Sequence, residues 1–545
     1  MTILKFLSNN DSINFDDNVL YITFSKAIYI NNKQRNNIIY FFDIDHNVNE
    51  KEINSLIEKN LFEEYKINNN EYYPLTFKYI YRYFITYTQF YNRLDYIIRK
   101  YNKIKSIEYS INISFIFTKA VNAICRKYSI KSKPIDEQFI GFSWRHNNEI
   151  SSDIIPEIDK HSFFIYLYAK YLKFINHKVF ILPSSFITKL PSSINFLRFS
   201  IFNIFNKLKV ILRINRRIND VTGLTKMDFA KDIRHIYKLD NEIWNGYRED
   251  QIKLIEHVIN IFFDRLTPEY ISSLKLKITQ LLKWSNTKCV ILDETIDAFR
   301  RLISLSCESL KIDVEYMPHG IISEKLQFTY TSDDQYIRKY IPKTLAWNSY
   351  SSTCIKKMNL NSYPISFPIA ISSHKKSDPG DILVLLSHGD LINLNQFEED
   401  IIKILKLVDH KKNKIDWKTH HNTYINCVET MNNQKEYIEK LFNIKLNFIN
   451  NSQKVSSIMK NYRLIIFTTY TTGIYEAALL NVPFIIYSKE DEEPFGLILS
   501  KIPIANNETD FIRLMNSDNK EYLYLIRKSL SENISLNDYL SNKCA

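Results

Sequence analysis

The stretch from Leu464 to Tyr487, LIIFTTYTTGIYEAALLNVPFIIY, decides the fold. Its two apolar runs, residues 464–467 and 484–487, predict buried strands, and residues 474–480 between them predict a helix. A short turn rich in hydroxyl groups separates the first strand from the helix. Strand, turn, helix and strand in this order form one β–α–β unit, which predicts parallel strands in a single sheet.

The turn after the first strand carries the candidate binding groups Thr468, Thr471, Thr472 and Gly473. It lies between the carboxyl end of a strand and the N-terminus of a helix, where backbone N–H groups and the helix dipole favour an anion. Glu476 lies early in that helix, within reach of the same ligand. The pattern predicts a site for a phosphate-bearing substrate, although Glu476 can equally be an ordinary acid of the first turn.

Upstream of this unit, the chain alternates apolar runs with amphipathic segments. Strands are predicted at residues 19–24, 38–44, 104–109, 288–292, 314–317, 344–347, 382–386, 414–418 and 446–449. Helices are predicted at residues 76–101, 115–128, 296–310, 350–357, 397–407, 434–441 and 455–459. A polar segment with Pro379 and Gly380, residues 372–381, predicts a linker between two halves.

This alternation predicts an α/β fold of the GT-B-like kind, with two Rossmann-like domains facing a cleft. The first domain spans residues 1–372 and includes a mainly helical, basic insertion at about 150–285. The second spans residues 381–520, and residues 521–545 form a helical tail.

The composition bounds the class of protein. The chain has 545 residues and 45% hydrophobic residues, enough for more than one core. Its 6 cysteines show no CxxC spacing, which favours a reducing, cytoplasmic setting. The N-terminus has too short an apolar run for a signal peptide, and no apolar stretch is long enough to span a membrane.

The net charge of +12 is concentrated in one segment. Residues 161–219 contain no Asp or Glu, many aromatic residues and basic residues throughout. An amphipathic helix of this composition favours contact with an anionic membrane surface, which predicts a peripheral location at the inner face of a membrane. The alternative is a packed helix with solvated basic side chains. No nucleic-acid-binding motif accompanies the charge, so no nucleic-acid partner is expected.

Further polar groups follow predicted strands, at the edge where parallel sheets bind ligands. These candidates are Asp293 and Glu294, His319 with Gly320, Ser387 and His388, and His420 with His421. Because they come after strand ends, we expect His319-Gly320, His420-His421 and the threonine-rich turn to meet at the cleft. Taken alone, each has a structural alternative: Asp293 and Glu294 can cap the following helix, and Ser387-His388 can be a plain turn.

The order and spacing of three of these clusters resemble GT-B glycosyltransferases of bacterial surface-polysaccharide synthesis. The matching elements are His319-Gly320, the Lys418–His421 segment in place of a Lys-x-His-Pro element, and the threonine-rich turn. The group includes CDP-glycerol glycerophosphotransferases of teichoic-acid synthesis, and Kdo or sialic-acid transferases of capsule and lipopolysaccharide synthesis. The resemblance covers about residues 285–500. The proline that usually follows the histidine is absent, which leaves His420 and His421 both open.

The resemblance implies a role for each cluster. His319 is the candidate general base, since imidazole titrates near neutral pH, and Asp293 or Glu294 is its rival or its orienting partner. His420 or His421 contacts the donor phosphate, and Thr471, Thr472 and Gly473 hold it at the helix start. Glu476 resembles the acid that binds nucleotide ribose hydroxyls. Ser387 and His388 are further donor-side candidates.

The expected activity is transfer of a sugar from a nucleotide-sugar donor to a glycan or lipid-linked acceptor, with no metal and no cofactor. Three alternatives remain: a polyol-phosphate transferase of the CDP-glycerol type, a GT-B-fold sugar-nucleotide epimerase, and a glycan-assembly scaffold without catalysis. The Asp43-Ile44-Asp45 segment matches the short DxD metal motif of other glycosyltransferases, but the two predicted α/β domains argue against that reading. No Walker loop, GxGxxG, HExxH or GxSxG motif is present.

Overall fold

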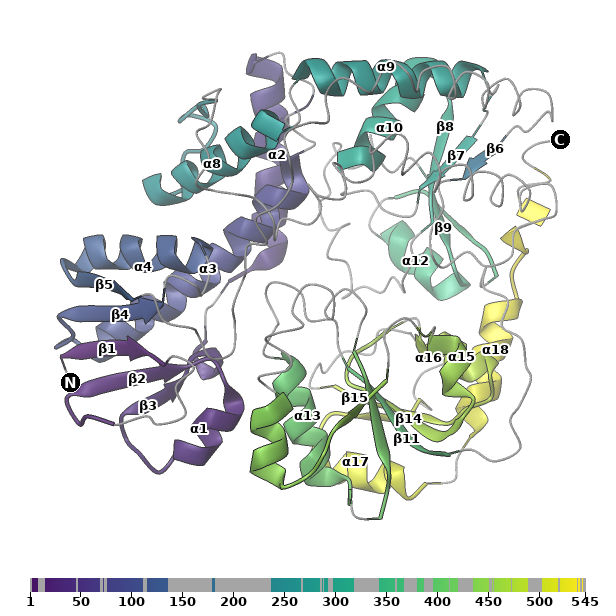
Figure 1. Ribbon diagram of the computed structural model, residues 1–545. Helices are drawn as coiled ribbons and strands as arrows, with labels where there is room; N and C mark the ends of the chain where they lie inside the picture. The colour runs from purple at the N-terminus through teal and green to yellow at the C-terminus, as the bar shows by residue number, and fades with distance from the viewer. Residues whose placement is uncertain are drawn as a thin grey trace.

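The computed structural model contains three separate, fully parallel sheets, each flanked by helices (Figure 1). It describes residues 2–7, 15–45, 48–68, 76–110, 115–135, 179–181, 237–265, 268–284, 289–292, 298–317, 343–357, 360–366, 380–386, 396–410, 412–419, 435–449, 455–471, 473–488, 502–517 and 520–536, with a few single positions such as Tyr539. The predicted α/β class with parallel, Rossmann-like sheets is confirmed.

The first sheet has the order β3-β2-β1-β4-β5. Its strands are β1 (Ile3–Phe6), β2 (Val19–Thr23), β3 (Ile38–Tyr40), β4 (Ser106–Ser110) and β5 (Lys131–Ile135). Its helices are α1 (Lys26–Asn32), α2 (Glu50–Asn68), α3 (Phe77–Lys100) and α4 (Phe115–Tyr128). The residues 41–44, predicted as the end of a strand, instead include a short 3-10 helix, η1 (Phe41–Asp43).

The second sheet has the order β10-β9-β8-β7-β6, so successive strands lie side by side. Its strands are β6 (Val179–Ile181), β7 (Cys289–Leu292), β8 (Asp313–Tyr316), β9 (Thr344–Ala346) and β10 (Ser362–Pro364). The accompanying helices are α8 (Glu249–Arg265), α9 (Pro268–Trp284), α10 (Ala298–Leu310) and α12 (Ser349–Lys357).

The third sheet has the order β13-β12-β11-β14-β15-β16. Its strands are β11 (Gly380–Leu385), β12 (Ile415–Lys418), β13 (Asn447–Phe448), β14 (Tyr462–Phe467), β15 (Phe484–Tyr487) and β16 (Ile504–Ala505). The helices α13 (Gln396–Leu407) and α17 (Glu508–Met515) pack on one face, whereas α15 (Val455–Met459), α16 (Gly473–Leu479) and α18 (Glu521–Ser531) pack on the other.

Residues 1–372, predicted as one Rossmann-like domain, contain both the first and the second sheet, and the third sheet spans residues 380–505. The first two sheets could not be told apart from the sequence, because apolar runs predict strands but not the sheet that each strand joins. Strand β6 lies inside the segment 150–285 that was predicted to be mainly helical, while α8 and α9 agree with that prediction. The rest of the basic segment 161–219 lies outside the described residues.

Each pair of sheets, with their helices, is joined by a shared cluster of buried apolar residues. One apolar cluster joins the first sheet to one face of the second, for example through Phe84 and Leu305. A second cluster joins the other face of the second sheet to the third, through residues such as Trp347 and Ile474. In the third cluster, Ala27 of α1 packs with residues of the third sheet. Each sheet is therefore anchored to both of the others by burial of apolar surface.

Candidate functional site

The order of strands in the third sheet defines where a ligand is expected. In chain order the strands run 3-2-1-4-5-6, so the direction of winding reverses between β11 and β14. These two strands are hydrogen-bonded along their length, and Leu385 pairs with Phe467 at their carboxyl ends. In open parallel sheets a crevice for a ligand forms outside the carboxyl ends of the strands at this reversal. The threonine-rich turn begins there.

Thr468 links the carboxyl ends of β14 and β11 by hydrogen bonds. Its backbone N–H donates to the carbonyl of Leu385 at 3.2 Å, and its hydroxyl donates to the same carbonyl at 3.4 Å. Its side chain is buried. Among the predicted donor-binding residues, Thr468 therefore fixes the spacing of β11 and β14 at the base of the site.

Thr471 organises the start of α16. Its hydroxyl oxygen accepts a hydrogen bond from the N–H of Gly473 at 3.4 Å, and its carbonyl accepts from Ile474 at 3.1 Å. Glu476 is half-buried in the first turn of the same helix. The structure thus brings Thr471, Gly473 and Glu476 together at one helix start, while Thr472 lies outside the described residues.

Gly473 permits a close approach between α16 and β14. An added Cβ would lie 3.0 Å from Phe467 Cε1 and 3.3 Å from Met459 Cε. Its backbone is not in the left-handed region, so close packing, and not the turn conformation, accounts for the glycine at this position. The absent side chain lets the first turn of the helix lie directly on the end of the strand.

The end of α16 is equally well defined. Asn481 has a φ of 58°, and the N–H of Val482 donates to the carbonyl of Ala477 at 3.0 Å. The N–H of Asn481 donates to Ala478 at 3.1 Å. These two bonds form a Schellman end, which turns the chain back into β15.

The other predicted site residues lie outside the described residues, but the strands that precede them are described. Strand β7 ends before Asp293 and Glu294, and β8 ends before His319. Likewise, β11 ends before Ser387 and His388, and β12 ends before His420 and His421. Every one of these strands is parallel to its neighbours, so the positions follow the carboxyl edges of the second and third sheets.

The carboxyl edge of the second sheet contacts α16, the helix that follows the threonine-rich turn, through a pair of polar residues. Asn348, which follows β9, donates from Nδ2 to the hydroxyl of Tyr475 in α16 at 3.1 Å. Both side chains are buried. Trp347 and Met317 from the same edge share an apolar cluster with Tyr470 of the turn. The sequence gives no local signal for this contact, because the two partners are 127 residues apart.

Lys418 is a buried cation at the carboxyl end of β12, next to Leu385 of β11. Burial lowers its pKa from the ordinary lysine value. Lys418 belongs to the Lys418–His421 segment but was not among the predicted site residues. A lysine at the end of a short strand, IDWK, in which every residue is buried, is the available signal. It lies one strand away from the reversal point.

The DxD-like segment takes part in a salt bridge of the first sheet. Lys26 Nζ lies 2.8 Å from Asp43 Oδ1, and its ammonium group also lies 4.3 Å from the ring centre of Tyr40. Among the described residues, no three His, Cys, Asp or Glu side chains gather as a metal site would require.

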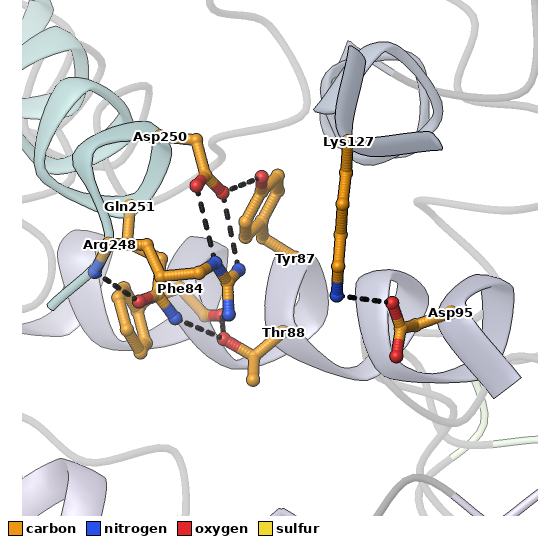
Figure 2. Close-up of polar contacts among 8 residues, drawn as sticks. All are labelled: Phe84, Tyr87, Thr88, Asp95, Lys127, Arg248, Asp250 and Gln251. Atoms are coloured by element: carbon orange, nitrogen blue, oxygen red, sulfur yellow. Dashed lines mark hydrogen bonds and ion pairs between the residues drawn. The ribbon is translucent and has the colours of Figure 1, made fainter. Parts of the chain in front are cut away.

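A separate polar network holds α8 on α3 (Figure 2). Asp250 accepts from the Tyr87 hydroxyl and lies 3.2 Å from Arg248 Nη2, while the Arg248 guanidinium lies 3.8 Å from the ring centre of Tyr91. Burial and the hydrogen bond to Asp250 raise the pKa of Tyr87, so its hydroxyl stays protonated. The charges of Arg248 and Asp250 compensate each other. This indicates that the network has a structural role, which is to hold α8 against α3 of the first sheet.

Comparison with known proteins gives no family and no curated relative, since no family model and no curated protein matches the chain. Solved structures with partial similarity include glycosyltransferases and an epimerase. UDP-GlcNAc 2-epimerase from Methanocaldococcus jannaschii, in complex with UDP-GlcNAc and UDP, is 15% identical with a TM-score of 0.34, over 47% of this chain and 78% of that one. HepE from Anabaena, in complex with UDP and glucose, is 10% identical with a TM-score of 0.35, over 52% and 82%.

A glycosyltransferase from Rickettsia africae is 12% identical with a TM-score of 0.35, over 72% of this chain and 95% of that one. At these TM-scores the superpositions are loose, so the fold assignment rests on the strand order of the third sheet. Within the described residues, none of the helices has both the length and the apolar character needed to cross a membrane.

Proposed function

We propose that the chain is a glycosyltransferase of the GT-B type that binds a nucleotide-sugar donor at the third sheet. One observation carries the proposal: the reversal of strand order between β11 and β14 coincides with the turn from Thr468 to Gly473 and with Glu476. This is the place where doubly wound sheets bind nucleotides. Lys418, buried at the neighbouring strand end, supports an anionic ligand there.

The proposed chemistry places the donor phosphates against Thr471, Gly473 and either His420 or His421, with Glu476 on the ribose. On the acceptor side, His319 removes the proton from the attacking hydroxyl, and Asp293 or Glu294 is the rival base. Ser387 and His388 complete the donor side. No metal and no cofactor take part in this scheme; loss of transfer after treatment with a chelator would contradict that point.

The acceptor is proposed to be a surface glycan or a lipid-linked precursor at the inner face of the bacterial membrane. The basic, acid-free segment 161–219 supports this, because basic and aromatic side chains favour anionic lipid. Co-sedimentation with vesicles containing phosphatidylserine, compared with neutral vesicles, tests it. Equal recovery with both vesicle types would remove the membrane from the proposal.

Thermal unfolding of the chain in CMP, CDP, UDP and GDP tests the donor site. A nucleotide at ten times its dissociation constant adds about 1.4 kcal/mol to the free energy of unfolding. We expect a stabilisation by at least one nucleotide that Glu476→Gln weakens. Glu508→Gln is the matched control, since Glu508 is an exposed first-turn acid of α17 in the same unit. No shift with any nucleotide would favour the scaffold alternative.

Incubation with labelled donors separates the enzymatic alternatives. Transfer of the sugar to a glycan acceptor fits the proposal, and transfer of a polyol phosphate fits the CDP-glycerol type. Conversion of the sugar without any acceptor would identify an epimerase instead. The variant His319→Ala tests the base: unchanged transfer would assign the base to Asp293 or Glu294.

A further inference from the structure

The contact between Asn348 and Tyr475 links the two sheets that border the candidate site. Asn348 directly follows Trp347 at the carboxyl end of β9, and Tyr475 is the third residue of α16. The second sheet is thereby joined by a hydrogen bond to the helix that begins at the donor turn, which is the threonine-rich turn from Thr468 to Gly473. The side chain of Tyr475 is only 3% exposed and that of Asn348 8%, so water does not compete freely for the bond.

The polarity of this bond is fixed by a second one. Asn348 Oδ1 accepts from the backbone N–H of Ser351 at 2.7 Å, which makes Asn348 the N-cap of α12. A backbone N–H can only donate, so the amide oxygen faces Ser351 and the amide nitrogen faces Tyr475. One side chain therefore holds the start of α12 and the start of α16 at the same time.

Tyr475 and Glu476 are adjacent in the first turn of α16, so their side chains leave the helix about 100° apart. Tyr475 points into the apolar cluster between the second and third sheets, while Glu476 is half-buried. Helix α16 has only seven residues. A shift of Tyr475 therefore moves Glu476 and the end of the donor turn with it.

We propose that Asn348 is a positioning residue for the nucleotide site: through Tyr475 it sets the place of Glu476 and of the donor turn relative to the second sheet. The inference rests on the proposed nucleotide-binding function. It predicts that a side chain of the second sheet, which does not itself touch the nucleotide, controls nucleotide affinity in the third.

Substitutions at Asn348 separate its two hydrogen bonds. Asn348→Ser keeps an N-cap for α12, because serine is a good N-cap residue, but is too short to reach Tyr475. Tyr475→Phe removes only the hydroxyl. Asn348→Asp keeps the cap and accepts a hydrogen bond from the Tyr475 hydroxyl, which remains protonated because burial raises its pKa. Loss in the first two variants and rescue in the third is the signature of positioning.

The control is Ser349→Ala. The Ser349 hydroxyl donates to Asn533 Oδ1 at 2.9 Å, so this variant also removes a hydrogen bond between α12 and the C-terminal segment, but it leaves α16 untouched. The probe is whichever of CMP, CDP, UDP and GDP binds the unmodified chain most tightly, and the readouts are its dissociation constant by calorimetry and the melting temperature without ligand.

We expect Asn348→Ser and Tyr475→Phe to weaken nucleotide binding roughly three- to tenfold, as loss of one buried hydrogen bond predicts. Asn348→Asp and Ser349→Ala should bind as the unmodified chain does, whatever their melting temperatures. Unchanged affinity in Asn348→Ser and Tyr475→Phe would overturn the inference and leave the proposed function standing. Absence of binding by the unmodified chain would overturn the proposed function and the inference with it.

Discussion

Glu398 of α13 accepts a hydrogen bond of 2.8 Å from the hydroxyl of Ser25, the residue that caps α1 of the first sheet. The same carboxylate oxygen accepts from the backbone N–H of Ala27 at 2.6 Å. Next to it, Glu399 accepts from the Tyr40 hydroxyl at 2.9 Å. The first turn of α13, which packs on the third sheet, therefore contacts the start of α1, which belongs to the first sheet. Glu398 is fully buried in this contact.

This burial makes the contact depend on pH. Burial raises the pKa of Glu398 from 4.5 to about 7, against the opposing effect of its hydrogen-bond donors. Between these two pH values the folded chain keeps a proton that the unfolded chain has lost. The free energy of unfolding therefore falls as the pH rises through this window and is level above it.

We expect Glu398→Gln to be more stable than the unmodified chain at pH 8, because the amide oxygen still accepts from Ser25 and Ala27 but carries no charge. The gain is at most roughly 3 kcal/mol and should vanish near pH 4.5. Urea unfolding at both pH values measures it. Glu399→Gln is the control, and an identical pH profile in both variants would show that Glu398 is not the responsible group.

A buried ion pair joins α2 of the first sheet to α10 of the second. Arg301 Nη1 lies 2.7 Å from Glu58 Oε1, and both side chains are 3% exposed. Removing one member leaves a buried charge without its partner, so we expect Arg301→Met to cost about 3–5 kcal/mol of unfolding free energy. Replacing both, in Arg301→Met with Glu58→Leu, should recover part of this loss.

Urea unfolding of the single and double variants measures the coupling. The exposed pair of Lys253 and Glu249 on α8 is the matched comparison, and Lys253→Ala should change stability by less than about 1 kcal/mol. If Arg301→Met cost no more than Lys253→Ala, the pair would not be the joint between α2 and α10 that its burial indicates.

The elements of the third sheet could be predicted from the sequence because each is a strong local pattern. Residues 455–459 and 484–487 form the predicted helix and strand with the same bounds, since buried parallel strands are continuous apolar runs. Strand β5 was missed because its sequence, KSKPI, is mostly exposed and has no apolar run. The sequence also did not predict that the first sheet is separate from the second, since the pairing partners of a strand leave no local trace.

The candidate site also contains residues that local sequence predicts and residues that it does not. The position of the turn after β14 follows from local sequence, and the structure describes Thr471, Gly473 and Glu476 at one helix start. Asn348 could not be found, because an asparagine after a strand is an ordinary cap or turn residue, and only the tertiary contact with Tyr475 distinguishes it. His319 and the other candidates beyond the described residues stay predictions.

The scarcity of glycine leaves strain at helix ends. The chain has 8 glycines, and Ser129, Lys311, Asn443 and Asn481 adopt φ values of 50–58° after helices, where glycine is usual. Lys311 is exposed and its neighbour Ile312 donates back to Cys307 at 3.0 Å. We expect Lys311→Gly to add about 1 kcal/mol of stability, and Lys311→Ala to add none, in thermal unfolding. If Lys311→Ala raised the stability as much as Lys311→Gly, the backbone at residue 311 would not be strained.

Gly473 provides a test of how α16 packs on β14. A methyl group there would lie 3.0 Å from the ring of Phe467, which is itself fully buried and lies edge-on to Phe484 with ring centres 5.6 Å apart. The ring cannot retreat without disturbing β15, whereas the end of Met459 is flexible. We expect Gly473→Ala to destabilise the chain by about 1 kcal/mol, since overpacking outweighs the higher helix propensity of alanine.

A double-mutant cycle isolates this contact. Phe467→Leu alone should be destabilising, because it removes buried apolar volume, but it also makes room for the methyl group at residue 473. The double variant should therefore lose less free energy of unfolding than the two single variants added together. We expect the difference, measured by urea unfolding, to be at least about 0.5 kcal/mol. Additive losses would mean that α16 shifts away from β14 to accept the methyl group. Nucleotide affinity would then fall in Gly473→Ala as well, because the same shift displaces Glu476.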